Sequence, residues 1–199
     1  MLKTLILASQ SPRRSEILKN AHYFFIPFPV YVSEIPQKNL SLDHQIIDIA
    51  RRKAEACVQQ FPDLGQEHIV LASDTMVCLD HIALGKPEDE KQAFEFLSAL
   101  SNRSHQVKTA VVMYDHESQT WLSHIETTEV IFKKISDIEI LDYIKTQEPM
   151  DKAGAYAIQG LGGKFVEKIS GEFDNVVGLP LQAVEKLFTI NQWQIRRVP

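Results

Sequence analysis

The sequence predicts an α/β fold built around a mixed β-sheet. Strand-like apolar segments alternate with helical periodicities along only part of the chain, and two long strand-like segments follow one another in its second half. The composition, 44% hydrophobic and 24% charged over 199 residues, is that of an ordinary globular protein. A chain of this length can bury a sizeable core. We expect one domain over residues 1–199, because no linker, repeat or low-complexity tract interrupts it.

The first elements follow from apolar runs and capping residues. Residues Leu2–Ala8 read as a buried strand. Ser11 is expected to cap the next helix, and Pro12 suits its first position. The segment 24–35, "FFIPFPVYVSEI", is extended but interrupted by prolines. It is therefore predicted to be an edge strand or irregular.

A long helix and a long strand come next. Ser41 or Asp43 begins a helix over 43–61, since its apolar residues recur at helical spacing. Those residues are Ile46, Ile49, Ala50, Ala54, Cys57 and Phe61. The segment 68–80, "HIVLASDTMVCLD", predicts a strand, and Asp80-His81 predicts a turn after it.

The second half contains two long strands flanked by helices. Pro87 and Asp89 open a helix over 88–101. The segments 105–115 and 119–135 are expected to form long antiparallel strands.

The remaining elements close the chain. Ser136 and Glu139 form a capping box before a helix over 138–147. A glycine-rich turn region, a strand over 164–170 and a last helix near 180–188 follow.

Charge and motif content exclude several classes of protein. A net charge of −5 argues against a general nucleic-acid binder. Phosphate-loop, dinucleotide, zinc-peptidase and serine-hydrolase motifs are absent. Cys57 and Cys78 show neither zinc nor disulfide spacing, as expected in a reducing compartment. The start, "MLKTLILAS", is too short for a signal peptide or membrane span, so we expect a cytoplasmic protein with no membrane contact.

Two adjacent arginines mark the first turn between strand and helix. Arg13 and Arg14 lie where free backbone N–H groups and the positive end of the helix dipole already favour an anion. Arginine offers forked donors that match phosphate oxygens. The pair predicts a phosphate-binding turn, with solvated surface charges as the alternative.

Three other features suggest a site. Asp74, directly after an apolar run, is predicted at a strand end, where it can bind a metal or activate water; a turn cap is the alternative. Lys86 lies in a loop stiffened by Pro87. Six of the eight glycines lie from Gly154 to Gly178, which predicts a backbone that approaches something closely, or structural turns. Cations and carboxylates at element ends suit a metal-bound polyphosphate.

Four segments in order resemble the signature segments of the Maf family of nucleoside triphosphate pyrophosphatases: "LASQSPRRSEIL", "SDTMV", "LGKP" and "MDKAGAYAIQGLGGKFVEKISGEFDNVVGLPL". The resemblance extends from residue 3 to about residue 185. It implies hydrolysis of a nucleoside triphosphate to the monophosphate and pyrophosphate, assisted by Mg²⁺ or Mn²⁺. It also implies an elongated, two-lobed fold around a bent sheet, related to inosine triphosphate pyrophosphatases, and a homodimer.

The resemblance also implies roles for individual residues. Asp74 matches the catalytic proton acceptor, and Glu34 with Asp74 matches the metal ligands. The residues that match substrate-binding positions are Ser9, Arg13, Arg14, Lys53 and Lys86. The family often has two acidic residues after its second strand, whereas Ser33 precedes Glu34 here. One metal ligand is therefore missing or replaced by water.

Three positions separate substrate subgroups within that family. Arg13, Thr75 and Gln159 match the subgroup that resembles dTTP and UTP pyrophosphatases. The subgroup that resembles 7-methyl-GTP enzymes has other residues at all three. We therefore expect a hydrolase of phosphorus anhydrides acting on dTTP, UTP and modified pyrimidine nucleotides. The alternatives are a pyrophosphatase for 7-methyl-GTP or another nucleotide, and a non-enzymatic regulator of cell division.

Overall fold

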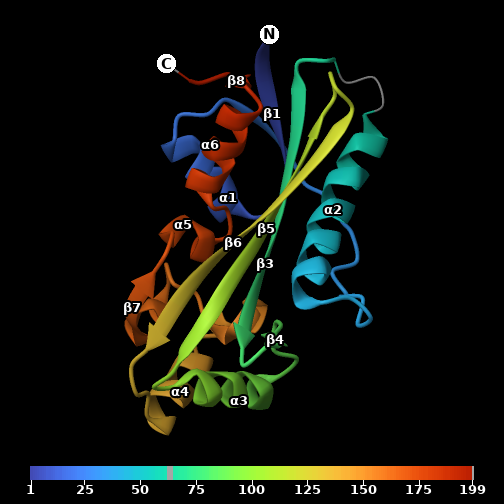
Figure 1. Ribbon diagram of the computed structural model, residues 1–199. Helices are drawn as coiled ribbons and strands as arrows, with labels where there is room; N and C mark the ends of the chain where they lie inside the picture. Colours follow the sequence, from blue (N-terminus) through green and yellow to red (C-terminus); the bar gives the residue numbers. More distant parts are fainter. Residues whose placement is uncertain (62–64, 199) are drawn as a thin grey trace. The chain divides into compact units, whose positions relative to one another are not determined.

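The computed structural model describes residues 1–61 and 65–198. Within these residues the chain forms one mixed sheet of eight strands and six α-helices (Figure 1). The predicted α/β class is confirmed. The chain divides into two compact units. Unit 1 comprises Met1–Asp74, Thr109–Glu126 and Gly178–Pro199, and unit 2 comprises Thr75–Lys108 and Thr127–Val177. The single domain over 1–199 stays a prediction.

The strands of the sheet run in the order β2-β1-β3-β5-β6-β7. Strand β1 (Leu2–Ala8) pairs in parallel with β2 (Phe25–Phe28), with β3 (His68–Leu79) and with the short β8 (Gln194–Ile195). Strands β5 (Ser104–Asp115) and β6 (Thr120–Phe132) are neighbours, as the two long adjacent segments predicted.

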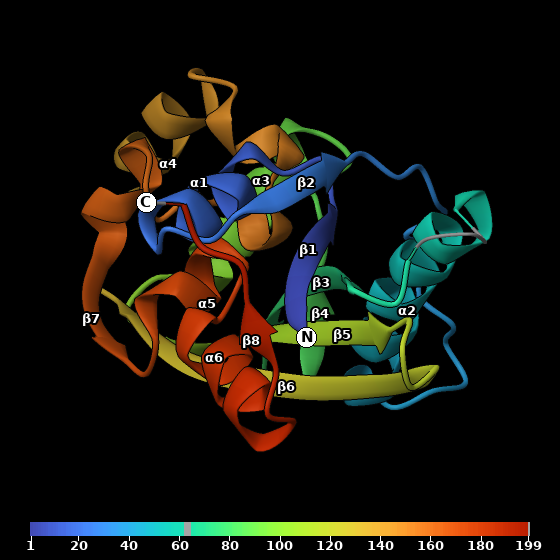
Figure 2. The same ribbon diagram turned by 90° about the horizontal axis from the view of Figure 1, so that it is seen from above.

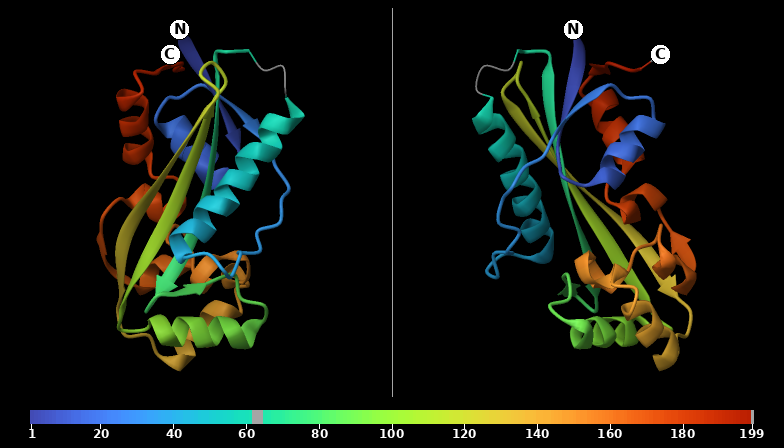
Figure 3. Two further views of the ribbon diagram at one scale, coloured as in Figure 1. Left: turned by 45° about the vertical axis from the view of Figure 1, so that its right-hand side comes forward. Right: turned by 180° about the vertical axis from the view of Figure 1, so that it is seen from behind.

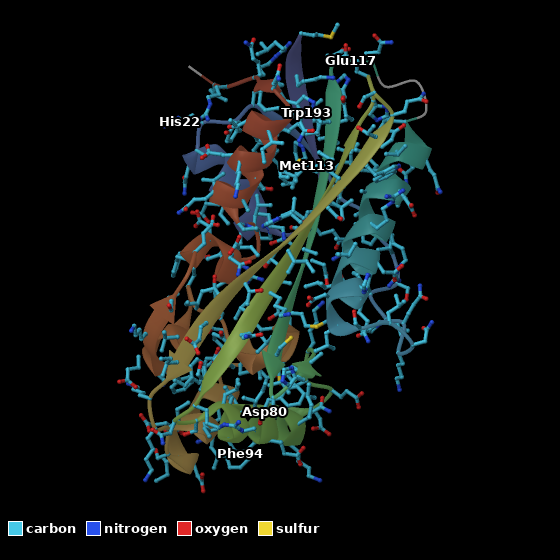
Figure 4. The ribbon with its side chains drawn as sticks, in the orientation of Figure 1. His22, Asp80, Phe94, Met113, Glu117 and Trp193 are labelled. Atoms are coloured by element: carbon cyan, nitrogen blue, oxygen red, sulfur yellow. The ribbon has the colours of Figure 1, made fainter. Side chains whose placement is uncertain are left out.

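Helices cover both faces of the β1 and β3 strands in unit 1. Helix α2 (Leu42–Gln60) lies on one face, and α1 (Pro12–Asn20) and α6 (Leu181–Ile190) lie on the other (Figures 2 and 3). Strands covered on both faces need apolar residues at consecutive positions. Leu5, Ile6 and Leu7 are accordingly all buried, as is Met113 of β5 (Figure 4).

Unit 2 contains the C-terminal part of β3, from Thr75 onward, and a set of short elements. β3 turns at Asp80-His81 into the antiparallel β4 (Ile82–Leu84), and both turn residues are left-handed, with φ of 49° and 65°. That turn was predicted, and Asp80 marks it in Figure 4. The other elements are α3 (Glu90–Leu100), α4 (Asp137–Ile144), α5 (Phe173–Val177), β7 (Val166–Ser170) and three 3₁₀ helices. Its core contains Phe132, Tyr143 and Phe165.

Three of the four predicted helix caps are confirmed. The side chains of Ser41, Asp89 and Ser136 each accept a hydrogen bond from a backbone N–H in the first turn. The Glu139 carboxylate accepts from the Ser136 backbone N–H at 2.9 Å, which completes the capping box. Ser11 occupies the N-cap of α1, but its side chain makes no capping bond. The prediction for that side chain was wrong. The Ser11 backbone N–H donates to the Ser9 hydroxyl at 3.1 Å.

Other boundaries differ from the sequence predictions. Of the extended segment 24–35, only Phe25–Phe28 forms a strand, at the end of the sheet order as expected for an edge. The strand predicted from 164 begins at Val166, since Leu161–Phe165 forms a 3₁₀ helix. Helix α5 and strand β8 were not predicted. None of the described helices is long and apolar enough to cross a membrane.

Candidate active site

Two carboxylates of unit 1 share one lysine. The Lys53 ammonium lies 2.7 Å from Oε1 of Glu34 and 2.7 Å from Oδ1 of Asp74. The Lys53 side chain is 8% exposed, Asp74 15% and Glu34 47%. A lysine at this depth requires charged partners, because burial of an unpaired ammonium is costly. The three predicted residues therefore form one ion-pair cluster that opens to solvent on the Glu34 side.

Asp74 lies inside a strand, and this corrects its predicted place at a strand end. Strand β3 continues to Leu79, and Val77 pairs with Leu84 of β4. The apolar residues after Asp74 are buried by unit 2, so β3 does not stop where its first apolar run stops. A turn cap is excluded for the same reason. The carboxylate is held on a regular strand, which fixes its direction more firmly than a loop does.

Glu34 lies in an irregular segment that Arg52 holds. The Arg52 guanidinium donates to the carbonyl oxygens of Ser33 and Ile35, the residues on either side of Glu34. The Ser33 hydroxyl also accepts from the Ile35 N–H, at 3.4 Å. Arg52 and Lys53 are neighbours on α2, so one helix both positions the Glu34 backbone and pairs with its carboxylate. Sequence analysis missed Arg52, although its place beside Lys53 was the available signal.

Arg14 is buried beside these charges. Its Nε donates to the Gly178 carbonyl at 2.8 Å and its Nη1 to the Ser9 hydroxyl at 3.2 Å. Burial lowers the pKa of Arg14, and the charges of Asp74 and Glu34 act in the opposite direction. Arginine stays protonated at such a site, since its ordinary pKa is above 12. Arg14 is not a solvated surface charge, and that alternative is wrong for it.

The Gly178 carbonyl anchors this arrangement. It accepts from Arg14 and also from the Ser73 hydroxyl, at 3.0 Å. Gly178 has a φ of 123°, a conformation that only glycine adopts without strain. Ser73, directly before Asp74, is fully buried. Sequence analysis missed it, because a serine inside an apolar run reads as strand.

Arg13 and the start of α1 complete the cationic part of unit 1. Arg13 precedes Arg14 in the first turn of the helix, which contains no acidic residue. The positive end of the helix dipole and both arginines create a positive potential. The predicted residues that unit 1 brings together are Ser9, Arg13, Arg14, Glu34, Lys53 and Asp74.

The donor set fits a divalent cation of the magnesium type. Two carboxylate oxygens already converge on one cation, the Lys53 ammonium. Mg²⁺ is bound in proteins by one or two carboxylates, with water and substrate phosphates as its other ligands. No group of three or more acidic, histidine or cysteine side chains with metal-binding geometry occurs among the residues that the structure describes. A site built here would therefore depend on phosphate oxygens.

Thr75, Lys86 and Gln159 belong to unit 2. Lys86 is exposed in the loop after β4, where the Gly85 carbonyl accepts from the Gly154 N–H at 3.0 Å. Gln159 is exposed in a turn that the Gly160 N–H closes on the Ala157 carbonyl, at 3.2 Å. The "LGKP" and glycine-rich segments, far apart in sequence, are thus joined by a backbone hydrogen bond.

The chain is similar to proteins of known sequence over nearly its whole length. A family model described as "Maf-like protein" matches residues 4–190. A dTTP/UTP pyrophosphatase of Bdellovibrio bacteriovorus is 48% identical over 95% of this chain and 99% of its own. One from Bacillus velezensis is 46% identical, over 91% and 93%. One from Photorhabdus laumondii is 44% identical, over 94% of each. A solved nucleoside-triphosphatase/dITP/XTP pyrophosphatase of Mycobacterium abscessus covers 95% of this chain and 96% of its own, at 12% identity and a TM-score of 0.41.

Proposed function

Since the chain belongs to the Maf-like protein family, we propose that it is a pyrophosphatase that hydrolyses dTTP and UTP to the monophosphate and pyrophosphate. Curated relatives that carry this name match it at 48% and 46% identity over at least 91% of its length. The observation that carries the proposal is the Glu34–Lys53–Asp74 cluster, with Arg14 buried beside it. This combination supplies both an acceptor for a proton and positive charge for phosphate oxygens.

Phosphate binding is assigned to the cations of the first helical turn. The guanidinium groups of Arg13 and Arg14 offer charge-assisted donors to polyphosphate oxygens at the positive end of α1. Ser9 and Gly178 hold the Arg14 guanidinium in place before substrate arrives. Donors that are already oriented lose little entropy on binding and strengthen as charge develops. Lys86 is proposed as a further phosphate ligand on the strength of its motif.

Asp74 is proposed as the proton acceptor. A water oxygen attacks the α-phosphorus, and its proton passes to the Asp74 carboxylate. The bond from the α-phosphorus to the bridging oxygen then breaks, and pyrophosphate leaves with the electron pair. The Lys53 ammonium, 2.7 Å from Oδ1 of Asp74, holds the carboxylate in place before the attack.

A divalent cation completes the proposed site. Glu34 and Asp74 would hold Mg²⁺ or Mn²⁺ together with phosphate oxygens. Bound there, the ion neutralises phosphate charge. Lys53 contacts the same two carboxylates, so it holds them together in the absence of the ion. Removal of the metal with a chelator should abolish turnover, and Mg²⁺ or Mn²⁺ should restore it.

A panel of nucleotides tests the function. The protein is incubated with Mg²⁺ and each of dTTP, UTP, CTP, ATP, GTP and 7-methyl-GTP, and pyrophosphate release is measured. We expect the highest kcat/KM for dTTP and UTP. A preference for 7-methyl-GTP or a purine would support the alternative subgroup. Absence of release from every triphosphate would favour a binding protein that regulates cell division.

Hydrolysis in ¹⁸O-water should place the label in the monophosphate, and label in pyrophosphate would exclude attack at the α-phosphorus.

Two further properties are proposed, one from the family resemblance and one from the N-terminal segment and the cysteines. We expect a homodimer, which sedimentation of the purified chain would test. We also expect a cytoplasmic location, which fractionation of the source cells would test. Cys57 and Cys78 are both buried and form no disulfide, as suits a reducing compartment.

A further inference from the structure

A tyrosine–glutamate pair holds the turn that carries Gln159. The turn spans residues 157–162 and will be called loop 157–162. Tyr143, at the end of α4, donates from its hydroxyl to Oε1 of Glu148 at 2.7 Å. Tyr143 is buried, and Glu148 begins the 3₁₀ helix Glu148–Asp151. Neither residue belongs to the four motifs that the sequence analysis used for the site.

The pair binds the backbone on both sides of Gln159. Before it, the Ala157 N–H donates to the Tyr143 hydroxyl at 3.2 Å. After it, the Leu161 N–H donates to Oε2 of Glu148 and the Gly162 N–H to Oε1, each at 3.0 Å. The Glu148 carboxylate thereby caps the 3₁₀ helix that begins at Leu161. Three N–H groups of loop 157–162 thus depend on two side chains.

The glycines of this loop are explained by the same pair. A Cβ on Gly160 would lie 2.4 Å from a Glu148 carboxylate oxygen, and a Cβ on Gly162 would lie 2.6 Å from the Tyr143 hydroxyl. Atoms do not approach at such distances, so both positions require glycine while Glu148 and Tyr143 stay where they are. Here the backbone comes close to internal side chains. For these two glycines the predicted close approach of the backbone is confirmed, and the groups that it approaches are side chains of the protein itself.

The electrostatics favour a persistent arrangement. The hydrogen bonds from Tyr143, Gly162 and Leu161 outweigh desolvation and lower the pKa of Glu148. Desolvation and the bond to Glu148 raise the pKa of Tyr143. The tyrosine therefore stays a donor and the glutamate stays an ionised acceptor across the neutral range. Each hydrogen bond to an ionised carboxylate is stronger than the same bond to a neutral acceptor.

We infer that Glu148 and Tyr143 are positioning residues for base selection, which hold loop 157–162 so that Gln159 presents its amide to a uracil or thymine edge. This rests on the proposed function. Gln159 itself is exposed in the turn and needs support from its backbone to point in one direction. Binding to a pre-oriented amide avoids the entropy cost of ordering it. The pair acts on substrate preference through Gln159, without touching the substrate.

The first test measures preference. Glu148→Gln replaces one accepting oxygen by a donor, so either Leu161 or Gly162 loses its partner, and Tyr143→Phe removes the hydroxyl from Ala157 and Glu148. We expect each variant to lower the ratio of kcat/KM for UTP to kcat/KM for GTP by roughly tenfold, mainly through a higher KM for UTP. The fold-loss of this ratio in the double variant should be smaller than the product of the two single fold-losses, because both residues act on one turn.

Matched controls come from a second tyrosine–glutamate pair. In unit 1 the Tyr23 hydroxyl donates to Glu185 at 2.8 Å. Tyr23→Phe and Glu185→Gln remove the same groups elsewhere and should leave the UTP:GTP ratio unchanged. Gln159→Ala should lower the ratio as the positioning variants do. A general loss of folded protein would lower kcat for both nucleotides alike, and that result would overturn the inference.

The second test measures the loop without substrate. Hydrogen exchange at the Ala157, Leu161 and Gly162 amides should become faster in Glu148→Gln, while the Gly154 amide, bound to Gly85, should keep its rate. Unchanged exchange at all three would overturn the inference, as would an unchanged UTP:GTP ratio in Glu148→Gln or in Gln159→Ala. If the wild-type protein hydrolyses no triphosphate, the proposed function fails, and the exchange rates alone decide whether the pair holds the loop.

Discussion

The shared lysine decides how a substitution at Asp74 would act. Asp74→Asn removes the proton acceptor but leaves Lys53 paired with Glu34 at 2.7 Å. The fold should therefore persist, while kcat falls on the order of 10²-fold or more, as for the loss of a general base. Steady-state kinetics and a thermal melt on the same sample check both parts. The control Asp142→Asn, at an exposed pair with Lys145, should keep its rate. A folded Asp74→Asn with a near-normal rate would remove Asp74 from the chemistry.

Gln159 carries a prediction about selectivity at the same scale. A glutamine offers a donor and an acceptor, which match the N3–H and carbonyl groups of uracil or thymine. Glutamate only accepts when ionised and suits a guanine edge better. Gln159→Glu should therefore lower kcat/KM for dTTP and UTP more than for guanine nucleotides, by roughly tenfold. An equal loss for every nucleotide would contradict a role in base selection.

Helix caps give a prediction at the scale of the element. Ser136 caps α4 with a side-chain bond, whereas Ser11 sits at the N-cap of α1 without one. Ser136→Ala should therefore lower the free energy of unfolding by about 1 kcal/mol. Ser11→Ala should lower it far less, although both residues occupy the same position in a helix. Chemical denaturation of the two variants compares them directly, and equal losses would show that the hydroxyl bond is not the cause.

Local signals explain which elements could be predicted. Ser41, Asp89 and Ser136 precede clear helical periodicity, so propensity, cap and packing agree. Helix α5 could not be predicted because it is short and lies between a glycine and another glycine, where local preference points to turns. The place of Asp74 inside β3 was missed because pairing with β4, a tertiary contact, extends the strand beyond its first apolar run.

The sequence predicted the charged residues of the candidate site, but it did not predict the residues that position them. Arg14 and Asp74 belong to the signature segments, Lys53 matches a further position of the family, and contacts within unit 1 bring the three residues together. Arg52, Ser73 and Glu148 position other residues through backbone carbonyls and N–H groups. Such partners lie far apart in sequence and depend on where the backbone runs. A single sequence without its fold gives no signal for Ser73 or Glu148, and for Arg52 it gives only the place beside Lys53.

For the molecule as a whole, His105 predicts a response of stability to acid. His105 of β5 is buried, its Nε2 lies 2.9 Å from the Tyr156 hydroxyl, and burial lowers its pKa to about 4 from 6.5. Between these values the unfolded chain takes up a proton that the folded chain does not. Stability is therefore present above pH 6.5 and is lost as the pH falls to 4, by about 3 kcal/mol.

Urea denaturation at several pH values measures this effect. His105→Gln cannot titrate, so its free energy of unfolding should fall less steeply than that of the wild type between pH 6.5 and 4. His44→Gln, at an exposed histidine on α2, is the control for replacement of a histidine by glutamine. Parallel curves for the wild type and His105→Gln would contradict the buried, neutral state of His105.

The proline in β2 has a consequence for solubility. The backbone N–H and C=O groups of successive strand residues point alternately to the two edges, and the Phe28 carbonyl accepts from the Ser9 N–H, on the β1 side. The nitrogen of Pro27, which has no hydrogen to donate, therefore faces the outer edge of the sheet. The exposed side chains of Phe24 and Ile26 lie nearby in sequence. An open edge with apolar neighbours invites strand addition by another chain, and a proline there breaks the hydrogen-bond template. Pro27→Val would restore that template, and we expect it to raise the rate of fibrillar aggregation, measured by thioflavin fluorescence, without altering catalysis.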